Sequence, residues 1–145
     1  MIPEQALNIV LDRLDELGIP YMISGSFASN AYGLSRVTQD ADVIIETSLP
    51  ELLHLMDSLE GEFYADRDAA EESFSGNRML NVIHLDTGFK IDIILRKKRA
   101  FSVEEFNRRL PIIFLGKERW FSSPEDTILA KLEWSKMGHS ERQFE

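Results

Sequence analysis

The sequence contains no cysteine, and only 5 of its 145 residues are proline and 8 are glycine. Without cysteine the chain can form no disulfide, offers no thiol nucleophile and can build no zinc site on thiolates. Its apolar runs fall well short of a membrane-spanning helix, which requires about 20 residues. The N-terminal segment holds an acid, Glu4, and no basic residue, which is not the pattern of a secretory signal. We therefore expect a cytoplasmic protein that does not enter a membrane.

Basic residues are scarce in the first part of the chain. Residues 1–86 hold 4 Lys or Arg against 16 Asp or Glu, residues 87–145 hold 12 against 9, and the net charge is −9. Sequence-blind binding to DNA is not expected, because the neutralisation of phosphates requires a basic surface. The composition is compatible with a small phosphorylated substrate whose charge is met by metal ions.

The length and the 43% apolar content indicate a single domain that spans 1–145. Apolar residues that recur every three to four positions predict helices at 3–17 and 49–59, and further helices are expected at 26–31, 102–109 and 123–137. Short apolar runs predict strands at 21–23, 40–46, 79–85, 89–95, 112–115 and 119–121. The last helix is expected to pack on the core. Together these elements predict an α+β fold.

Three local signals predict element boundaries. Asp86-Thr87-Gly88 joins two strand-like runs, which is typical of a hairpin. Ser102 followed by Glu105 has the spacing of a capping box and predicts a helix start. Ser123-Pro124 followed by two acids is a clear helix start. The polar stretch 61–77 carries no comparable signal, and its structure is not predicted.

Gly25 and Ser26 follow a buried strand and open a predicted helix. At such a helix start, free backbone N–H groups and a hydroxyl can point at a phosphate, and glycine permits a close approach. A Gly-Ser pair alone is a weak signal, because most such pairs lie in turns. Its weight depends on the acidic residues that follow.

Asp40 and Asp42 are two residues apart on a predicted strand, so their side chains share one face of the sheet. Two neighbouring carboxylates repel each other and raise each other's pKa unless a cation lies between them. The alternative is that both are solvated residues at the start of a strand. Without further residues, this simpler interpretation is favoured.

Asp92 changes that balance because it lies inside an otherwise apolar strand, where an unpaired carboxylate is costly. On a neighbouring strand it would face Asp40 and Asp42 and complete a cage for hard divalent cations. Mg²⁺ prefers oxygen ligands and shares its coordination shell with substrate phosphates. Two such ions at about 3.5–4 Å suit in-line displacement at phosphorus.

In this arrangement the chain resembles the nucleotidyltransferases of the DNA polymerase beta superfamily. Their signature is an apolar strand, a small pair and a helix, then Asp-x-Asp on the next strand and a later carboxylate on another. Here these residues are Gly25-Ser26, Asp40-Ala41-Asp42 and Asp92. The resemblance spans about 19–135 and implies a mixed sheet flanked by helices.

A closer likeness is to AbiEii-type and related minimal bacterial nucleotidyltransferases. Between Ser26 and Asp40 lie 13 residues, as in that pattern, and Tyr32, Arg36 and Thr38 match its intervening block. This likeness implies a relation to toxin–antitoxin systems.

The resemblance also implies an activity: the transfer of a nucleoside monophosphate from an NTP to an acceptor hydroxyl in RNA such as tRNA, in a protein or in a small molecule. Asp40, Asp42 and Asp92 would be the catalytic residues and the ligands of two Mg²⁺ ions, with Mn²⁺ as an alternative. The implied nucleotide-binding residues are Gly25, Ser26, Arg36 and Lys131.

Several alternatives are open at this point. Arg36 could pair with Asp40 instead of a phosphate, and Lys131 could be a solvated helix residue. The basic run at 96–99 could attract an anionic acceptor, but a solvated loop is the favoured interpretation. The chain could also be a non-catalytic nucleotide-binding module or a toxin partner with the same fold.

Overall fold

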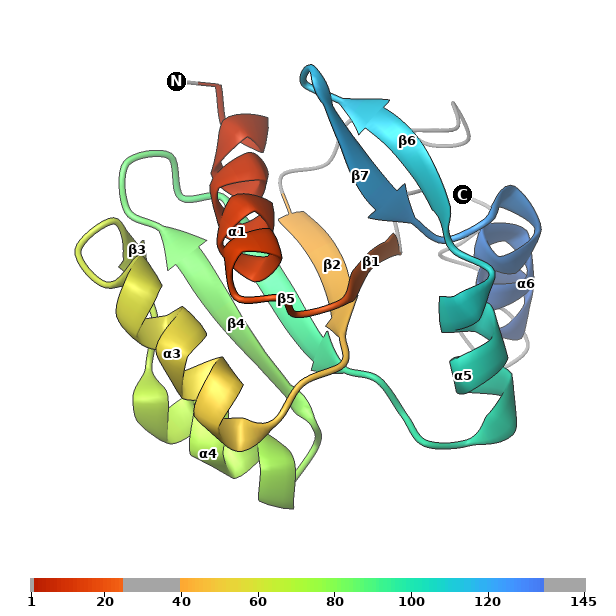
Figure 1. Ribbon diagram of the computed structural model, residues 1–145, viewed down its shortest axis with the longest axis horizontal. Coiled ribbons are helices and arrows are strands. Elements are labelled where there is room, and N and C mark those ends of the chain that lie inside the picture. The colour runs from red at the N-terminus through yellow and green to blue at the C-terminus, as the bar shows by residue number, and fades with distance from the viewer. Residues whose placement is uncertain (1, 25–39, 135–145) are drawn as a thin grey trace.

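A computed structural model describes residues 2–24 and 40–134, with side chains up to residue 129. In these residues the strands form one mixed sheet in the order β3-β4-β5-β2-β1-β7-β6 (Figure 1). The strands are β1 (Tyr21–Ser24), β2 (Asp40–Ile45), β3 (Phe63–Tyr64), β4 (Met79–His84), β5 (Lys90–Leu95), β6 (Leu110–Phe114) and β7 (Lys117–Phe121). The pairs β2–β5 and β1–β7 are parallel, and the other neighbours are antiparallel. The predicted α+β class is confirmed.

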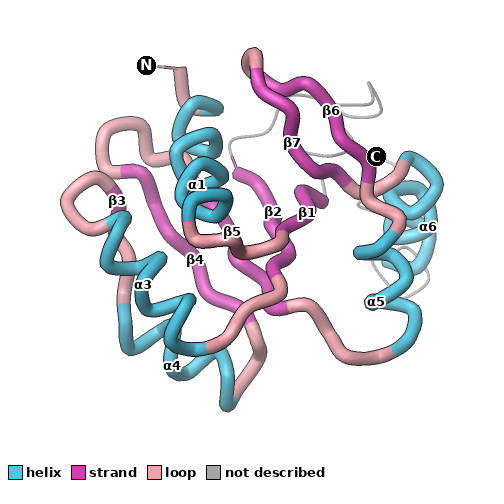
Figure 2. The backbone as a smooth tube through the Cα atoms, in the orientation of Figure 1, coloured by secondary structure: helices cyan, strands magenta, loops and turns pink. Residues whose placement is uncertain are grey.

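The helices lie in two groups, which Figure 2 distinguishes from the strands by colour. Their bounds are α1 (Glu4–Glu16), α3 (Leu49–Leu59), α4 (Arg67–Ser75), α5 (Ala100–Asn107) and α6 (Pro124–Trp134). The first three pack on one face of the sheet, and α5 and α6 lie beside the β6–β7 end (Figure 1). None of the described helices is long and apolar enough to pass through a bilayer.

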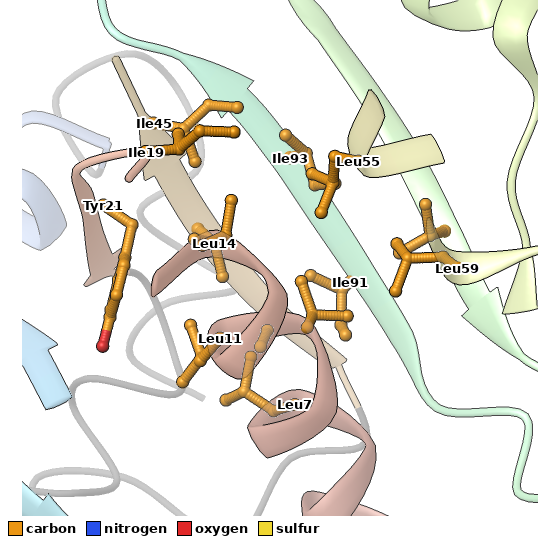
Figure 3. Packing of buried hydrophobic residues seen from close by; sticks show 14 of the residues in the cluster. Leu7, Leu11, Leu14, Ile19, Tyr21, Ile45, Leu55, Leu59, Ile91 and Ile93 are labelled. Atoms are coloured by element: carbon orange, nitrogen blue, oxygen red, sulfur yellow. The ribbon is translucent and has the colours of Figure 1, made fainter. Parts of the chain in front are cut away.

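The core lies between the sheet and the first group of helices. From the helices, this core includes Leu7, Leu11 and Leu14 of α1 and Leu55 and Leu59 of α3 (Figure 3). Alternate residues of the two central strands point into this layer. They are Ala41, Val43 and Ile45 of β2, and Ile91, Ile93 and Leu95 of β5. The residues between them therefore point to the opposite face of the sheet.

The predicted boundaries are partly confirmed. The β4–β5 hairpin is present, and Gly88 adopts φ +73°, a left-handed conformation that favours glycine. Ser123 caps α6, because its hydroxyl oxygen accepts the Asp126 N–H at 3.1 Å. The start predicted at Ser102 is wrong: α5 begins at Ala100, and no side chain caps it.

The polar stretch without a predicted structure contains β3 and α4. Asp66 caps α4, since its carboxylate accepts the Asp68 N–H at 2.9 Å. The buried residues of this helix are Ala70 and Ser73, so it has no large apolar stripe for a sequence pattern to detect. The helix predicted at 26–31 and the end of the last helix at 135–137 lie outside the described residues.

Arg119 of β7 joins that strand to α1 although its side chain is only 1% exposed. Its guanidinium donates to Asp12 at 2.6 Å, to Asp15 at 3.0 Å and to the Asn8 side chain at 3.1 Å. Its buried charge is therefore paired with two carboxylates of α1 and hydrogen-bonded to a neutral amide of the same helix.

We predict that Arg119→Met lowers the free energy of unfolding by about 2 kcal/mol, because it removes several charge-assisted hydrogen bonds at a buried site. The control is Lys117→Met, which removes an exposed ion pair to the same Asp12 and should cost less than about 1 kcal/mol. Urea unfolding of both variants tests this. Equal losses would contradict a special role for the buried guanidinium.

Candidate functional site

A row of polar side chains crosses four strands on the face of the sheet that points away from the core. Asp42 of β2 lies directly beside Asp92 of β5 in the parallel register. Ser24 of β1 is the partner of Asp42 on its other side, and Asn81 of β4 is the partner of Asp92. Because paired residues on neighbouring strands share a face, the four side chains form one row.

The expected juxtaposition of Asp42 and Asp92 is therefore present, although 50 positions separate them in the chain. Asp40 shares their face but lies two residues away along β2, or about 7 Å. It is exposed and has Lys90 as its partner on β5. The structure thus brings two of the three predicted carboxylates into contact and leaves the third at the margin of the site.

The carboxylates of Asp42 and Asp92 repel each other. Burial raises the pKa of Asp42 from 3.8 to about 6, and the neighbouring Asp92 carboxylate, to which it is also hydrogen-bonded, adds to the rise. Asp40 acts in the same direction and Lys90 in the opposite one. A cation between Asp42 and Asp92 would reverse this effect, because it favours the charged form of both.

Asp92 has an unsatisfied oxygen. Its side chain is 14% exposed, and its Oδ1 is buried without a hydrogen-bond donor among the described residues. Lys90 Nζ lies 3.7 Å from this oxygen, which is too far for a hydrogen bond. A buried carboxylate oxygen in this state is a suitable ligand for a hard metal ion.

A pair of carboxylates, and not the expected cage of three, is what the described residues offer. Over residues 2–24 and 40–129, no three His, Asp or Glu side chains are grouped closely enough to hold one ion. Mg²⁺ is commonly bound through one or two carboxylates, with substrate phosphates and water completing its octahedron. Asp42 and Asp92 fit that mode of binding.

The other predicted site residues are not placed by the described structure. Gly25, Ser26 and Arg36 lie outside the described residues, and Lys131 belongs to α6 in a part whose side chains are not described. In the sequence, Gly25 directly follows Ser24, the partner of Asp42. Their nucleotide-binding roles therefore stay predictions.

Sequence reasoning missed Asn81 and Lys90, which flank Asp92 on the same face. The predicted hairpin around Asp86-Thr87-Gly88 contained a signal for Asn81, because the position of the turn determines which residues of the two strands are paired. In the structure the His84 N–H donates to the Phe89 carbonyl at 2.9 Å, and counting back along both strands from this pair places Asn81 opposite Asp92.

No protein-family model matches the chain, and no curated protein matches it either. Several solved structures share its fold. TM1012 from Thermotoga maritima, a candidate nucleotidyltransferase, is 15% identical, with a TM-score of 0.64 over 98% of this chain and 91% of its own. The antibiotic-resistance factor ANT(2'')-Ia is 18% identical, with a TM-score of 0.59 over 91% of this chain and 71% of its own.

The third structure is the lincosamide antibiotic adenylyltransferase LnuA in complex with lincomycin. It is 12% identical, with a TM-score of 0.58 over 87% of this chain and 84% of its own. At these identities the likeness concerns the fold. The chain therefore has a nucleotidyltransferase-like fold, with a mixed sheet flanked by helices.

We predict that Asp42→Asn stabilises the metal-free protein at pH 7 and not at pH 4. The folded-state pKa of about 6 exceeds the ordinary 3.8, so the folded protein binds the proton more tightly than the unfolded chain. Wild-type stability therefore falls as the pH rises through this interval, and the asparagine variant avoids that loss.

Urea unfolding in EDTA at both pH values measures the difference. Asp40→Asn, at the exposed end of the same strand, is the control and should gain less. A variant Asp42→Asn that is less stable than the wild type at pH 7 would mean that the carboxylate is a structural hydrogen-bond partner.

Proposed function

We propose that this chain is a divalent-cation-dependent nucleotidyltransferase that moves a nucleoside monophosphate from an NTP to an acceptor hydroxyl. The observation that carries the proposal is the direct pairing of Asp42 with Asp92 on the face opposite the core, together with the unsatisfied Oδ1 of Asp92. Buried carboxylates that repel each other destabilise the fold, and a role in binding a catalytic metal would explain why these two residues are found together.

Asp42 and Asp92 would hold the ions, with Asp40 as a further ligand at the margin of the site. Two Mg²⁺ ions, or Mn²⁺ in their place, would supply positive charge that stabilises the attacking and leaving oxygens of an in-line displacement. The donor set is made of carboxylate oxygens alone, which suits these hard cations.

The chain's own residues have distinct roles in this reaction. Asp92 accepts the proton of the acceptor hydroxyl, whose oxygen forms a bond to the α-phosphorus. The bond between the α-phosphorus and the bridging oxygen breaks, and pyrophosphate leaves. Gly25, Ser26, Arg36 and Lys131 would hold the phosphates of the nucleotide through backbone N–H groups, a hydroxyl and two cations.

The fold neighbours support this class of reaction. LnuA is an adenylyltransferase whose structure contains the antibiotic lincomycin. By analogy, the acceptor of this chain would be a small molecule, with RNA such as tRNA or a protein as the other substrates that the same chemistry permits. We place the reaction in the cytoplasm. We also propose that the chain is related to AbiEii-type enzymes and to toxin–antitoxin systems.

We predict that labelled NTP with Mg²⁺ transfers label to a component of a cell extract, and that Asp92→Asn or Asp42→Asn lowers transfer at least about 100-fold, because each deletes a metal ligand. The control is Asp86→Asn, which changes the same charge in the exposed turn of the β4–β5 hairpin and should leave transfer unchanged. Equal transfer by wild type and Asp92→Asn would contradict the mechanism.

A second prediction concerns the binding of the nucleotide. Mg²⁺ with an NTP should raise the Tm far more than either component alone, because the carboxylates tolerate a triphosphate only with metal present. Ligand at 100-fold above its Kd stabilises the native state by about 2.7 kcal/mol, which thermal unfolding resolves.

In the same measurement, Ser26→Ala should weaken the effect of the nucleotide and leave the effect of Mn²⁺ alone intact, since the change removes a phosphate donor and no carboxylate. A Tm that no combination of metal and nucleotide moves would favour a non-catalytic module or a toxin partner with this fold.

A further inference from the structure

A cavity of about 180 Å³ lies on the same sheet face as the carboxylate pair. Its floor is formed by Met22, Ile44 and Ile94, which are partners of one another across β1, β2 and β5. Each lies two residues along its strand from the row that contains Asp42 and Asp92, which is a step of about 7 Å. The cavity therefore lies directly beside the carboxylate row, one step further along the strands.

The rim of this cavity is basic. Arg96, Lys97 and Arg99 line it from the loop that leads from β5 to α5, a loop that Figure 2 shows as one continuous segment. Ser102 and Glu105 of α5 also belong to the lining. The lining thus contains three cations and one carboxylate, in a chain whose net charge is −9.

The three rim cations are only partly neutralised by their neighbours. Arg96 is 16% exposed and pairs with Glu46 at 3.2 Å, but its buried Nε has no acceptor among the described residues. Arg99 donates to the neutral Ser102 hydroxyl at 3.0 Å. Lys97 is exposed, and within the described part of the chain no salt bridge involves it.

An apolar floor below a cationic rim matches a molecule with an apolar body and an anionic group. Arg96 lies four residues beyond Asp92, or about 13 Å along an extended strand. A small molecule whose anion is held at the rim and whose body covers Ile44 and Ile94 would present its far end to Asp92.

We propose that this cavity binds the acceptor, and that the acceptor is a small organic anion (a phosphate, sulfate or carboxylate) with an apolar body and a hydroxyl at the opposite end. This inference rests on the proposed function. The hydroxyl oxygen forms the bond to the α-phosphorus, its proton passes to Asp92, pyrophosphate leaves, and the anionic group stays unchanged. The loop at 96–99 is then more than a solvated segment, with Lys98 as its member outside the cavity lining.

Binding can be measured without any transfer reaction. In EDTA, phenyl phosphate should shift the methyl NMR signals of Met22, Ile44 and Ile94, because its ring would lie on the cavity floor. Benzylammonium has the same ring and the opposite charge, so it should leave them in place. Unshifted signals with phenyl phosphate, or equal shifts with both probes, would overturn the proposal.

A matched pair of variants tests the rim. Lys97→Glu should weaken the binding of phenyl phosphate about tenfold, since it replaces an attractive charge by a repulsive one. Lys98→Glu makes the same change one residue away, outside the cavity lining, and should stay within about twofold of the wild type at moderate salt. Equal weakening by both would mean that the loop attracts anions without a defined site.

Transfer assays separate this proposal from the proposed function. With the acceptor found in extract, Lys97→Glu should raise the KM for the acceptor about tenfold and leave the Tm shift by Mg²⁺ and NTP unchanged. Transfer to a cationic acceptor, or a KM that Lys97→Glu does not change, would overturn the cavity assignment and leave the transferase intact. Displacement of phenyl phosphate by Mg²⁺–ATP would also overturn it, by assigning the cavity to the nucleotide.

If no nucleotide moves the Tm and no component of the extract is labelled, the proposed function fails, and the acceptor assignment that rests on it fails too. Binding of phenyl phosphate would then describe only an anion site.

Discussion

The parallel pairing of β2 with β5 is the constraint on which the candidate site depends. It sets Asp42 beside Asp92, and the buried alternation of both strands fixes that register. A slip of one residue would turn Asp42 into the core and expose Val43 instead, so the hydrophobic layer excludes it. The packing against α1 and α3 therefore determines the geometry of a site that lies on the other face.

The packing of this core also offsets the unfavourable electrostatic free energy of placing two carboxylates side by side. Asp42 and Asp92 are both largely withdrawn from water, and the raised pKa of Asp42 expresses the unfavourable free energy of keeping two anions there. The hydrophobic layer that offsets this cost lies on the opposite face, under α1, α3 and α4. The polar residues therefore stand apart from the main core, a pattern typical of functional sites.

The features that sequence reasoning could predict are those with a local period. Alternation on one strand placed Asp40 and Asp42 on a common face, and Asp92 stood out as a charge in an apolar run. The adjacency of β2 and β5 is a long-range pairing that no local pattern specifies. Helix α4 was missed because its buried face is built from Ala70 and Ser73. The role of Arg119 was missed because an arginine in a short strand is expected to be exposed, and its carboxylate partners lie on α1.

Along the outward face of β2 the side chains change from Asp40 and Asp42 to Ile44, and β5 makes the same change from Asp92 to Ile94. Two adjacent strands that switch from acid to apolar at the same register divide this face into a polar part and an apolar part. The loop after β5 then places its cations beyond the apolar part. A single register thus sets out, in order along the strands, two carboxylates and an apolar floor, and the loop that follows adds a group of cations. Because one register positions all three, a small molecule held at the cationic end, as proposed, would be aligned with the carboxylates by the sheet itself.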